Sequence, residues 1–159
     1  MKRVLGIDPG LNHTGWGVIE ACGDNMSWIS HGVLHPPKKL SLSERLLFLH
    51  KNVSDIITKY QPSEICIEDI FVNANPESSI KLGMARGVLI MLPAFFKLNL
   101  FEYTANQVKK AVAGFGHAQK DQIMQMVQLL ILPKMPLTPD SADALAVAIC
   151  HAGHICIPD

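Results

Sequence analysis

The sequence has no net charge, no long hydrophobic run and little cysteine. Its 14 Lys and Arg balance 14 Asp and Glu, so it lacks the basic excess typical of nucleic-acid-binding proteins. The longest apolar run, 88–96, contains Pro93 and stops at Lys97, far short of a membrane span. The apolar run before Asp8 is too short for a signal peptide. We therefore expect a cytoplasmic protein that does not cross a membrane.

The four cysteines form no recognisable pattern. No CxxC pair is present, which argues against a disulfide framework and a zinc ribbon. Cys150, His151, His154 and Cys156 are possible metal ligands, but they lie within seven residues and have no second arm. We expect buried thiols and a histidine at a helix end here.

What is present fits one globular domain spanning 1–159, because the chain has 159 residues, 48% of them apolar and 18% charged. The charge is unevenly distributed. Residues 1–77 hold 7 basic and 9 acidic side chains, 78–134 hold 7 and 2, and 135–159 hold 0 and 3. A basic middle between acidic ends fits a surface that meets a polyanion beside carboxylates that hold cations, although scattered solvated charges would give the same counts.

The pattern of apolar residues predicts a mixed sheet with helices on both faces. Three strands in a meander come first, at 3–8, 15–21 and 27–34. Strands and helices then alternate. The predicted elements are a helix at 41–61, a strand at 64–68, a helix from 77 to about 96 that bends or ends near Pro93, a strand at 99–103, and helices from 104, at 120–132 and at 138–151.

Four carboxylates occupy positions that soluble domains normally keep apolar. Asp8 ends the first strand and Glu68 the fourth, while Asp140 and Asp143 lie in the first turn of an apolar helix, about 60° apart. Unpaired buried carboxylates are costly. If strands one and four are neighbours, the four acids converge and require cations. Oxygen ligands favour Mg²⁺ or Mn²⁺, and a two-metal site suits phosphodiester hydrolysis.

Each acid also has a simpler explanation. Asp8 precedes Pro9-Gly10 and could form a turn. Asp140 and Asp143 could stabilise the helix dipole. Glu68 is harder to explain in this way, so the metal interpretation depends most on it.

Five blocks, taken together and in order, resemble the RuvC family of bacterial Holliday-junction resolvases. They are Gly6 to Gly10, Ile67 to Phe71, Lys81 to Gly87, Gln107 to Lys109 and Asp140 to Ala146.

The resemblance implies an RNase H-like α/β fold and a homodimer that makes paired nicks in four-way DNA junctions with Mg²⁺, or Mn²⁺ in its place, two ions per subunit. It also implies a partnership with a branch-migration helicase. The catalytic and metal-binding acids would be Asp8, Glu68, Asp140 and Asp143. The DNA-contacting residues would be Phe71, Arg86, Lys109 and Lys120.

The chain departs from the family in its charge. RuvC proteins usually carry basic residues after Phe71 and along the helix before the last one, but 72–76 and 124–132 contain no Lys or Arg. We therefore expect weaker DNA binding. The helix at 79–92 is a candidate dimer interface, and packing within the chain would explain its composition equally well.

Three other functions compete with junction cutting. The chain could hold junctions without cutting them, or cut another structured nucleic acid such as RNA. A third possibility takes Asp8-Pro9-Gly10 with Thr14-Gly15 as the phosphate loop of an actin-like or sugar-kinase ATPase. That fold needs two such domains, which 159 residues cannot supply.

Overall fold

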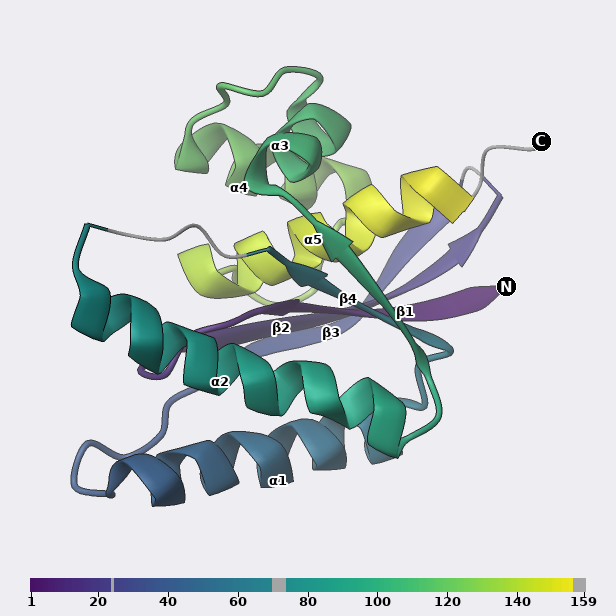
Figure 1. Cartoon of the computed structure of the whole chain (residues 1–159). Coiled ribbons are helices and arrows are strands. Elements are labelled where there is room, and N and C mark those ends of the chain that lie inside the picture. Colours follow the sequence, from purple (N-terminus) through teal and green to yellow (C-terminus); the bar gives the residue numbers. More distant parts are fainter. Residues whose placement is uncertain (24, 70–73, 156–159) are drawn as a thin grey trace.

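A five-stranded mixed sheet forms the centre of the molecule, as the sequence predicts (Figure 1). The computed structural model describes residues 1–23, 25–69 and 74–155. The strands are β1 (Lys2–Asp8), β2 (Thr14–Cys22), β3 (Asn25–Leu34), β4 (Glu64–Glu68) and β5 (Asn99–Tyr103), in the order β3-β2-β1-β4-β5. The first three are antiparallel, whereas β4 is parallel to both β1 and β5. Strands one and four are therefore neighbours.

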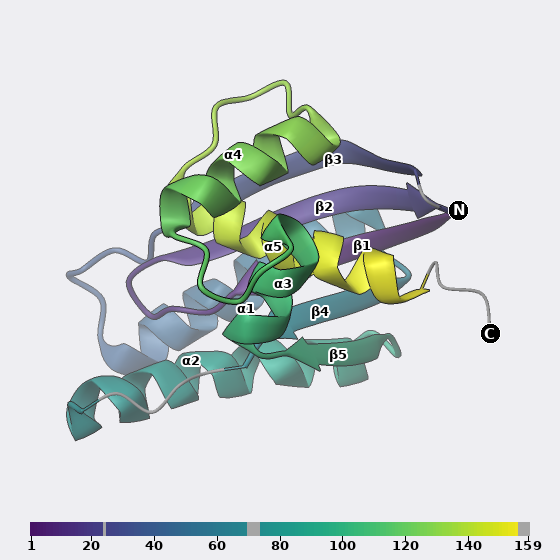
Figure 2. The same cartoon turned by 90° about the horizontal axis from the view of Figure 1, so that it is seen from above.

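The helices cover both faces of the sheet. On one face lie α1 (Leu42–Tyr60) and α2 (Pro76–Phe95), and on the other lie α3 (Ala105–Ala113), α4 (Lys120–Ile131) and α5 (Pro139–Ile155). Seen from above, α5 crosses the middle of the sheet, and α3 and α4 lie over it on the side away from the strands (Figure 2).

Side chains along β1 point alternately to the two faces of the sheet, and each face has its own layer of hydrophobic core. Leu5 and Ile7 pack with α1 and α2, while Val4 packs with residues of α3, α4 and α5. A strand buried on both faces reads as a continuous apolar run. An acid at the end of such a strand therefore lies at the rim of the core.

The helix boundaries follow their caps with small differences. The predicted capping boxes at Ser41 and Thr104 are both present. Pro93 lies in the last turn of α2, which continues only to Phe95. The last helix runs to Ile155, beyond the predicted end at 151, because its apolar surface continues to pack on the core.

Helix α5 lies directly against the backbone of the sheet. A Cβ added at Gly6 would overlap the carbonyl oxygen of Ala144, and one added at Gly15 would overlap that of Asp140. The middle of α5, from Ala144 to Ala152, is buried as a result. This contact sets the position of the first turn of α5 over the ends of β1 and β2.

Among the residues that the structure describes, α2 is a helix long and apolar enough to span a membrane by length and composition alone. Most of its surface is not buried within the domain. The helix packs on α1 and β5 of this domain, and helices of folded domains also pass such a test.

Candidate active site

Two of the four acids meet because their strands are parallel neighbours. Ile7 of β1 pairs with Ile67 of β4, so Asp8 and Glu68 come next on adjacent strands, at the same edge of the sheet. Buried runs on both strands bring the chain to this edge. The adjacency on which the sequence argument depended is therefore confirmed.

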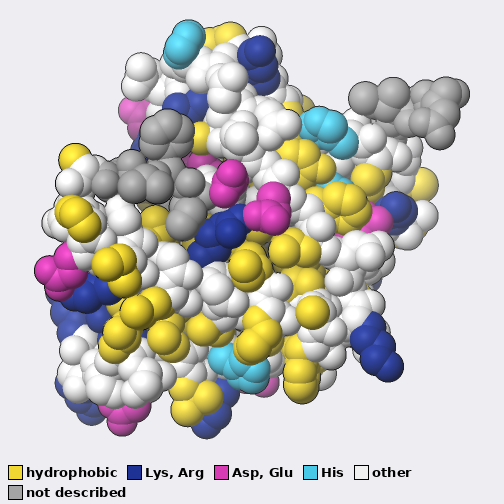
Figure 3. Space-filling view, viewed as in Figure 1, with side chains coloured by type: hydrophobic (Ala, Val, Ile, Leu, Met, Phe, Trp, Pro, Cys, Tyr) yellow, Lys and Arg dark blue, Asp and Glu magenta, His cyan; other side chains and the backbone are white. Residues whose placement is uncertain are grey.

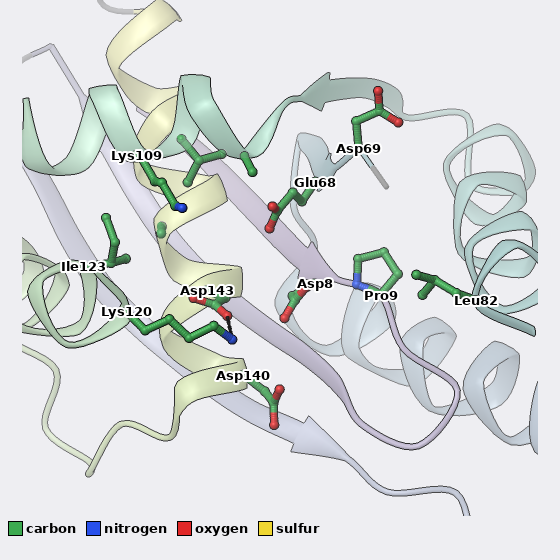
Figure 4. Close-up of a pocket in the computed structure, with 13 residues that line it drawn as sticks. Asp8, Pro9, Glu68, Asp69, Leu82, Lys109, Lys120, Ile123, Asp140 and Asp143 are labelled. Atoms are coloured by element: carbon green, nitrogen blue, oxygen red, sulfur yellow. Dashed lines mark ion pairs between the residues drawn. The ribbon is translucent and has the colours of Figure 1, made fainter. Parts of the chain in front are cut away.

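The other two acids come from the first turn of α5. Thr138 and Ser141 fix its beginning, because the amide of Ser141 donates to the Thr138 hydroxyl (3.3 Å) and the amide of Thr138 donates to the Ser141 hydroxyl (3.0 Å). Asp140 and Asp143 lie in this turn, and both are partly buried. Figure 4 shows both on the same side of the sheet edge as Asp8 and Glu68.

All four carboxylates line one open cavity of about 490 Å³. Lys109 of α3 and Lys120 of α4 also line it, and Figure 4 shows both lysines reaching toward the acids. The remaining lining residues are Pro9, Asp69, Leu82, Ala105, Val108, Ile123 and Ala146.

Asp8 lies deepest in the group. Burial, followed by the charges of Asp143, Glu68 and Asp140, raises its pKa from 3.8 to about 8, and Lys120 offsets part of that rise. Without a cation, Asp8 is therefore mostly protonated at neutral pH. A positive charge placed beside Asp8 would stabilise its ionised form.

Two further acids show the same effect. Burial, then the charge of Asp143, raises the pKa of Glu68, and Lys109 and Lys120 lower it in part. Burial also raises the pKa of Asp143, against the opposing charge of Lys120. The Lys120 ammonium lies 3.7 Å from a carboxylate oxygen of Asp143, and its side chain is 80% exposed. Such an exposed pair is weak, so the lysine can exchange partners easily.

The donor set fits a hard divalent cation. Carboxylate oxygens around one cavity, with raised pKa values, are the ligands that Mg²⁺ and Mn²⁺ prefer. Among the described residues, no three Asp, Glu, His or Cys side chains lie close enough together to hold one ion as they stand. Binding would therefore require the acids to rotate toward one another.

The expected DNA contacts are placed differently. Lys109 and Lys120 line the cavity. Phe71 lies outside the described residues. Arg86 does not line the cavity, and its guanidinium pairs with Glu102 and Asp69. The resemblance implied that Arg86 contacts DNA, whereas the structure gives it two carboxylate partners within the chain.

The Cys and His cluster is engaged in other contacts. His151 is buried, with Nε2 2.9 Å from Glu64 and Nδ1 2.8 Å from the hydroxyl of Tyr103. Cys150 is also buried, which raises the pKa of its thiol to about 11. Cys156 lies outside the described residues. The buried thiol expected at Cys150 is thus present, and His151 belongs to a core network.

Sequence reasoning missed Asp69 and Glu102, the two carboxylates that pair with Arg86. Asp69 lines the cavity beside Glu68 and lies 3.6 Å from Arg86. Because Arg86 is 17 residues away in the sequence and Glu102 lies on another strand, no local spacing signals this contact. The neighbouring acidic pair Glu68-Asp69 was the only hint.

Comparison with known proteins identifies the family of the chain. The family model described as crossover junction endodeoxyribonuclease RuvC matches residues 4–151. Relatives of that name include one from Bradyrhizobium diazoefficiens, 47% identical over 96% of this chain and 87% of that protein. Another, from Azorhizobium caulinodans, is 46% identical over 97% of this chain and 91% of that protein.

Solved structures give the same result. The T. thermophilus RuvC in complex with Holliday junction substrate matches with a TM-score of 0.90 and 29% identity, covering 98% of this chain and 96% of that chain. The yeast mitochondrial Holliday junction resolvase Ydc2 matches with a TM-score of 0.69 at 15% identity, covering 95% of this chain and 79% of that chain. At that identity the likeness to Ydc2 concerns the RNase H-like fold.

Proposed function

Because the chain belongs to the RuvC family of crossover junction endodeoxyribonucleases, we propose that it is a single nuclease domain that cuts four-way DNA junctions in a divalent-metal-dependent reaction in the cytoplasm. One observation carries the proposal. Four acids from β1, β4 and α5 surround one cavity that two lysines also enter. Recombination and repair are the processes that such an enzyme serves.

The metal ligands in this proposal are Asp8, Glu68, Asp140 and Asp143. Mg²⁺ fits them, with Mn²⁺ as a substitute, and four carboxylates suit two ions per subunit. When bound, the ions lower the pKa of the attacking water and stabilise the leaving 3′ oxygen. Asp8, at the end of β1, is the acid on which the charges of all three others act, and it would contribute its carboxylate to holding the ions. Binding requires its proton to leave.

The remaining cavity residues bind and orient the DNA strand. Lys109 and Lys120 line the cavity, where they could pair with phosphates, and the weak, exposed contact of Lys120 with Asp143 would not prevent this. Phe71 follows β4 closely in sequence, which supports a role for it in stacking on a base at the crossover, a contact worth about 1–3 kcal/mol.

A four-way DNA junction is symmetric, and we propose that the protein is a homodimer with the same symmetry. Helix α2 exposes a stripe made by Ile80, Met84, Met91 and Phe95, which fall within about 60° of one another at 100° per residue. Figure 3 shows hydrophobic side chains gathered over this helix. Gly87 on the same side has open space in front of it. A two-fold contact through this stripe would present two identical sites. A branch-migration helicase remains a proposed further partner.

A mobile synthetic four-way junction tests the function. With Mg²⁺ the protein should produce paired, symmetrically placed nicks, and Asp8→Asn should reduce the rate by about a thousandfold or more, because it removes a charged ligand. Linear duplex and structured RNA of equal length serve as controls. Absence of nicks with every divalent metal, or unchanged processing by Asp8→Asn, would contradict the proposal. Preferential cutting of the RNA would favour the alternative substrate.

A further inference from the structure

Arg86 occupies an unusual place for a basic residue in a nucleic-acid enzyme. It lies on α2, its side chain is only 12% exposed, and its guanidinium pairs with Glu102 of β5 and with Asp69 (3.6 Å) just after β4. Its Nε is buried and has no hydrogen-bond partner among the described residues. One side chain therefore links α2, β5 and the end of β4.

The location of Arg86 differs from that of the lysines that would meet DNA. Lys120 is 80% exposed and lines the cavity. Arg86 is mostly covered and already has two carboxylate partners, so contact with a phosphate would require it to break existing pairs. Planar guanidinium groups suit such paired carboxylate contacts.

The pair with Asp69 acts on the strand that carries Glu68. The amide of Asp69 donates to the carbonyl of Tyr103 (2.7 Å), and Glu68 lies opposite Tyr103 in the sheet register. Asp69 is therefore held twice: its backbone amide bonds to β5 and its side chain pairs with Arg86. Both contacts restrain the chain directly after Glu68.

The same pair also separates two adjacent carboxylates. Glu68 and Asp69 both line the cavity, but Figure 4 shows Asp69 turned away from the other four acids. Arg86 gives Asp69 a cationic partner, which keeps that carboxylate from competing for an ion. Glu68 is left as the ligand from this strand.

We propose that Arg86 is a positioning residue that holds the end of β4, and so the Glu68 carboxylate, in place for metal binding. The inference rests on the proposed function, since it assigns a role within the same site. Arg86 also lies roughly opposite the α2 stripe at 100° per residue, so it connects the proposed dimer helix to the metal-binding strand.

Three variants test this inference. Arg86→Gln removes the charge, Arg86→Lys keeps it, and Glu102→Gln removes a partner that is half exposed and thus less important for folding. Lys81→Gln is the matched control, because it removes a positive charge from the same helix at an exposed pair with Glu77. The readouts are Mn²⁺ affinity of the free protein, single-turnover nicking rate, thermal unfolding, and metal-free junction affinity as a function of salt.

We expect Arg86→Gln to weaken Mn²⁺ binding and slow single-turnover nicking, each by about tenfold, with junction affinity within twofold of wild type and an unchanged salt slope. Glu102→Gln should change the same two readouts less, Arg86→Lys should recover part of the loss, and Lys81→Gln should match wild type.

Two results would overturn the inference. If Arg86→Gln and Glu102→Gln lower only the unfolding temperature while Mn²⁺ affinity and rate stay normal, Arg86 has a purely structural role. If junction affinity falls and the salt slope drops by about one, Arg86 contacts DNA instead. A wild-type protein that binds Mn²⁺ without nicking would contradict the proposed function, and the affinity comparison would still decide the role of Arg86.

Discussion

At the residue scale, Asp8 combines deep burial with three neighbouring carboxylates. The raised pKa that results, about 8, means that the metal-free protein keeps a proton there at neutral pH. A cation that binds must displace this proton. Metal affinity should therefore increase with pH up to about 8.

The same titration predicts how Asp8 affects stability. Because the folded-state pKa lies above the unfolded value of 3.8, the folded protein binds more protons between these values, and its stability falls as pH rises from about 4 to 8. Asp8→Asn has no carboxyl group at this position, so its stability should not fall with pH for this reason. In metal-free buffer it should equal wild type near pH 4 and exceed it by on the order of 2 kcal/mol at pH 8.

Urea unfolding at several pH values, with and without Mg²⁺, measures the difference. Added Mg²⁺ should stabilise the wild type more than the variant, because the variant lacks one carboxylate. Equal stabilities across the pH range would contradict the burial and charge crowding assigned to Asp8.

The four acids could be predicted from sequence because each breaks an apolar run that a buried strand or helix requires. Their partners could not. Arg86, Asp69 and Glu102 meet only after α2 has packed against β5, and His151 finds Glu64 87 residues away. A periodic pattern records which side of an element is buried, but it does not identify the residue on the other element.

At the element scale, the position of α5 depends on two glycines beneath it. Gly15 lies under the carbonyl of Asp140, so Gly15→Ala must push the first turn of α5 away from the sheet. We expect a loss of about 1–3 kcal/mol in stability and a loss of nicking of about tenfold or more, because Asp140 and Asp143 move with that turn.

Gly153→Ala is the matched control. It lies in the same helix, where an added Cβ meets nothing within 4 Å, so it should stabilise the protein by about 0.5–1 kcal/mol and leave activity unchanged. Thermal unfolding and single-turnover nicking measure both variants. Normal activity in Gly15→Ala would show that α5 need not lie so close to the sheet.

The elements themselves were largely predictable. The acidic ends of β1 and β4 and the capping residues Ser41 and Thr104 mark boundaries that the structure reproduces. The extra turn of α5 was not foreseen, because Gly153 and His154 interrupt the apolar run in the sequence, although Ala152 and Ile155 pack on the core. The close contact of Gly6 and Gly15 with that helix also required the three-dimensional structure.

At the scale of the whole molecule, the net charge of zero is the sum of an acidic cavity and a basic remainder of the surface. Five of the 14 acids line the cavity, namely the four proposed metal ligands and Asp69. Bound cations would neutralise much of this charge and leave the lysines to attract DNA. Junction binding should therefore be weak without divalent metal and fall steeply with salt.

The proposed dimer is also a property of the whole molecule. Met84→Glu places a charge in the middle of the α2 stripe, so it should convert a dimer to a monomer and replace paired nicks by single, uncoordinated ones. Leu129→Glu is the control, since Leu129 is equally apolar and 69% exposed on α4.

Analytical ultracentrifugation and the product pattern of a junction assay read out the two effects. A dimer that survives Met84→Glu but is lost in Leu129→Glu would place the interface on the other face of the sheet.

Anomalous diffraction from a crystal soaked in Mn²⁺ tests the central claim most directly, because it locates the ions without requiring activity. We predict strong peaks within the cavity, bound by oxygens of Asp8, Glu68, Asp140 and Asp143, and their loss in Asp8→Asn crystals. Ordered Mn²⁺ bound only elsewhere, or a cavity that stays empty of Mn²⁺ at saturating concentration, would contradict the account.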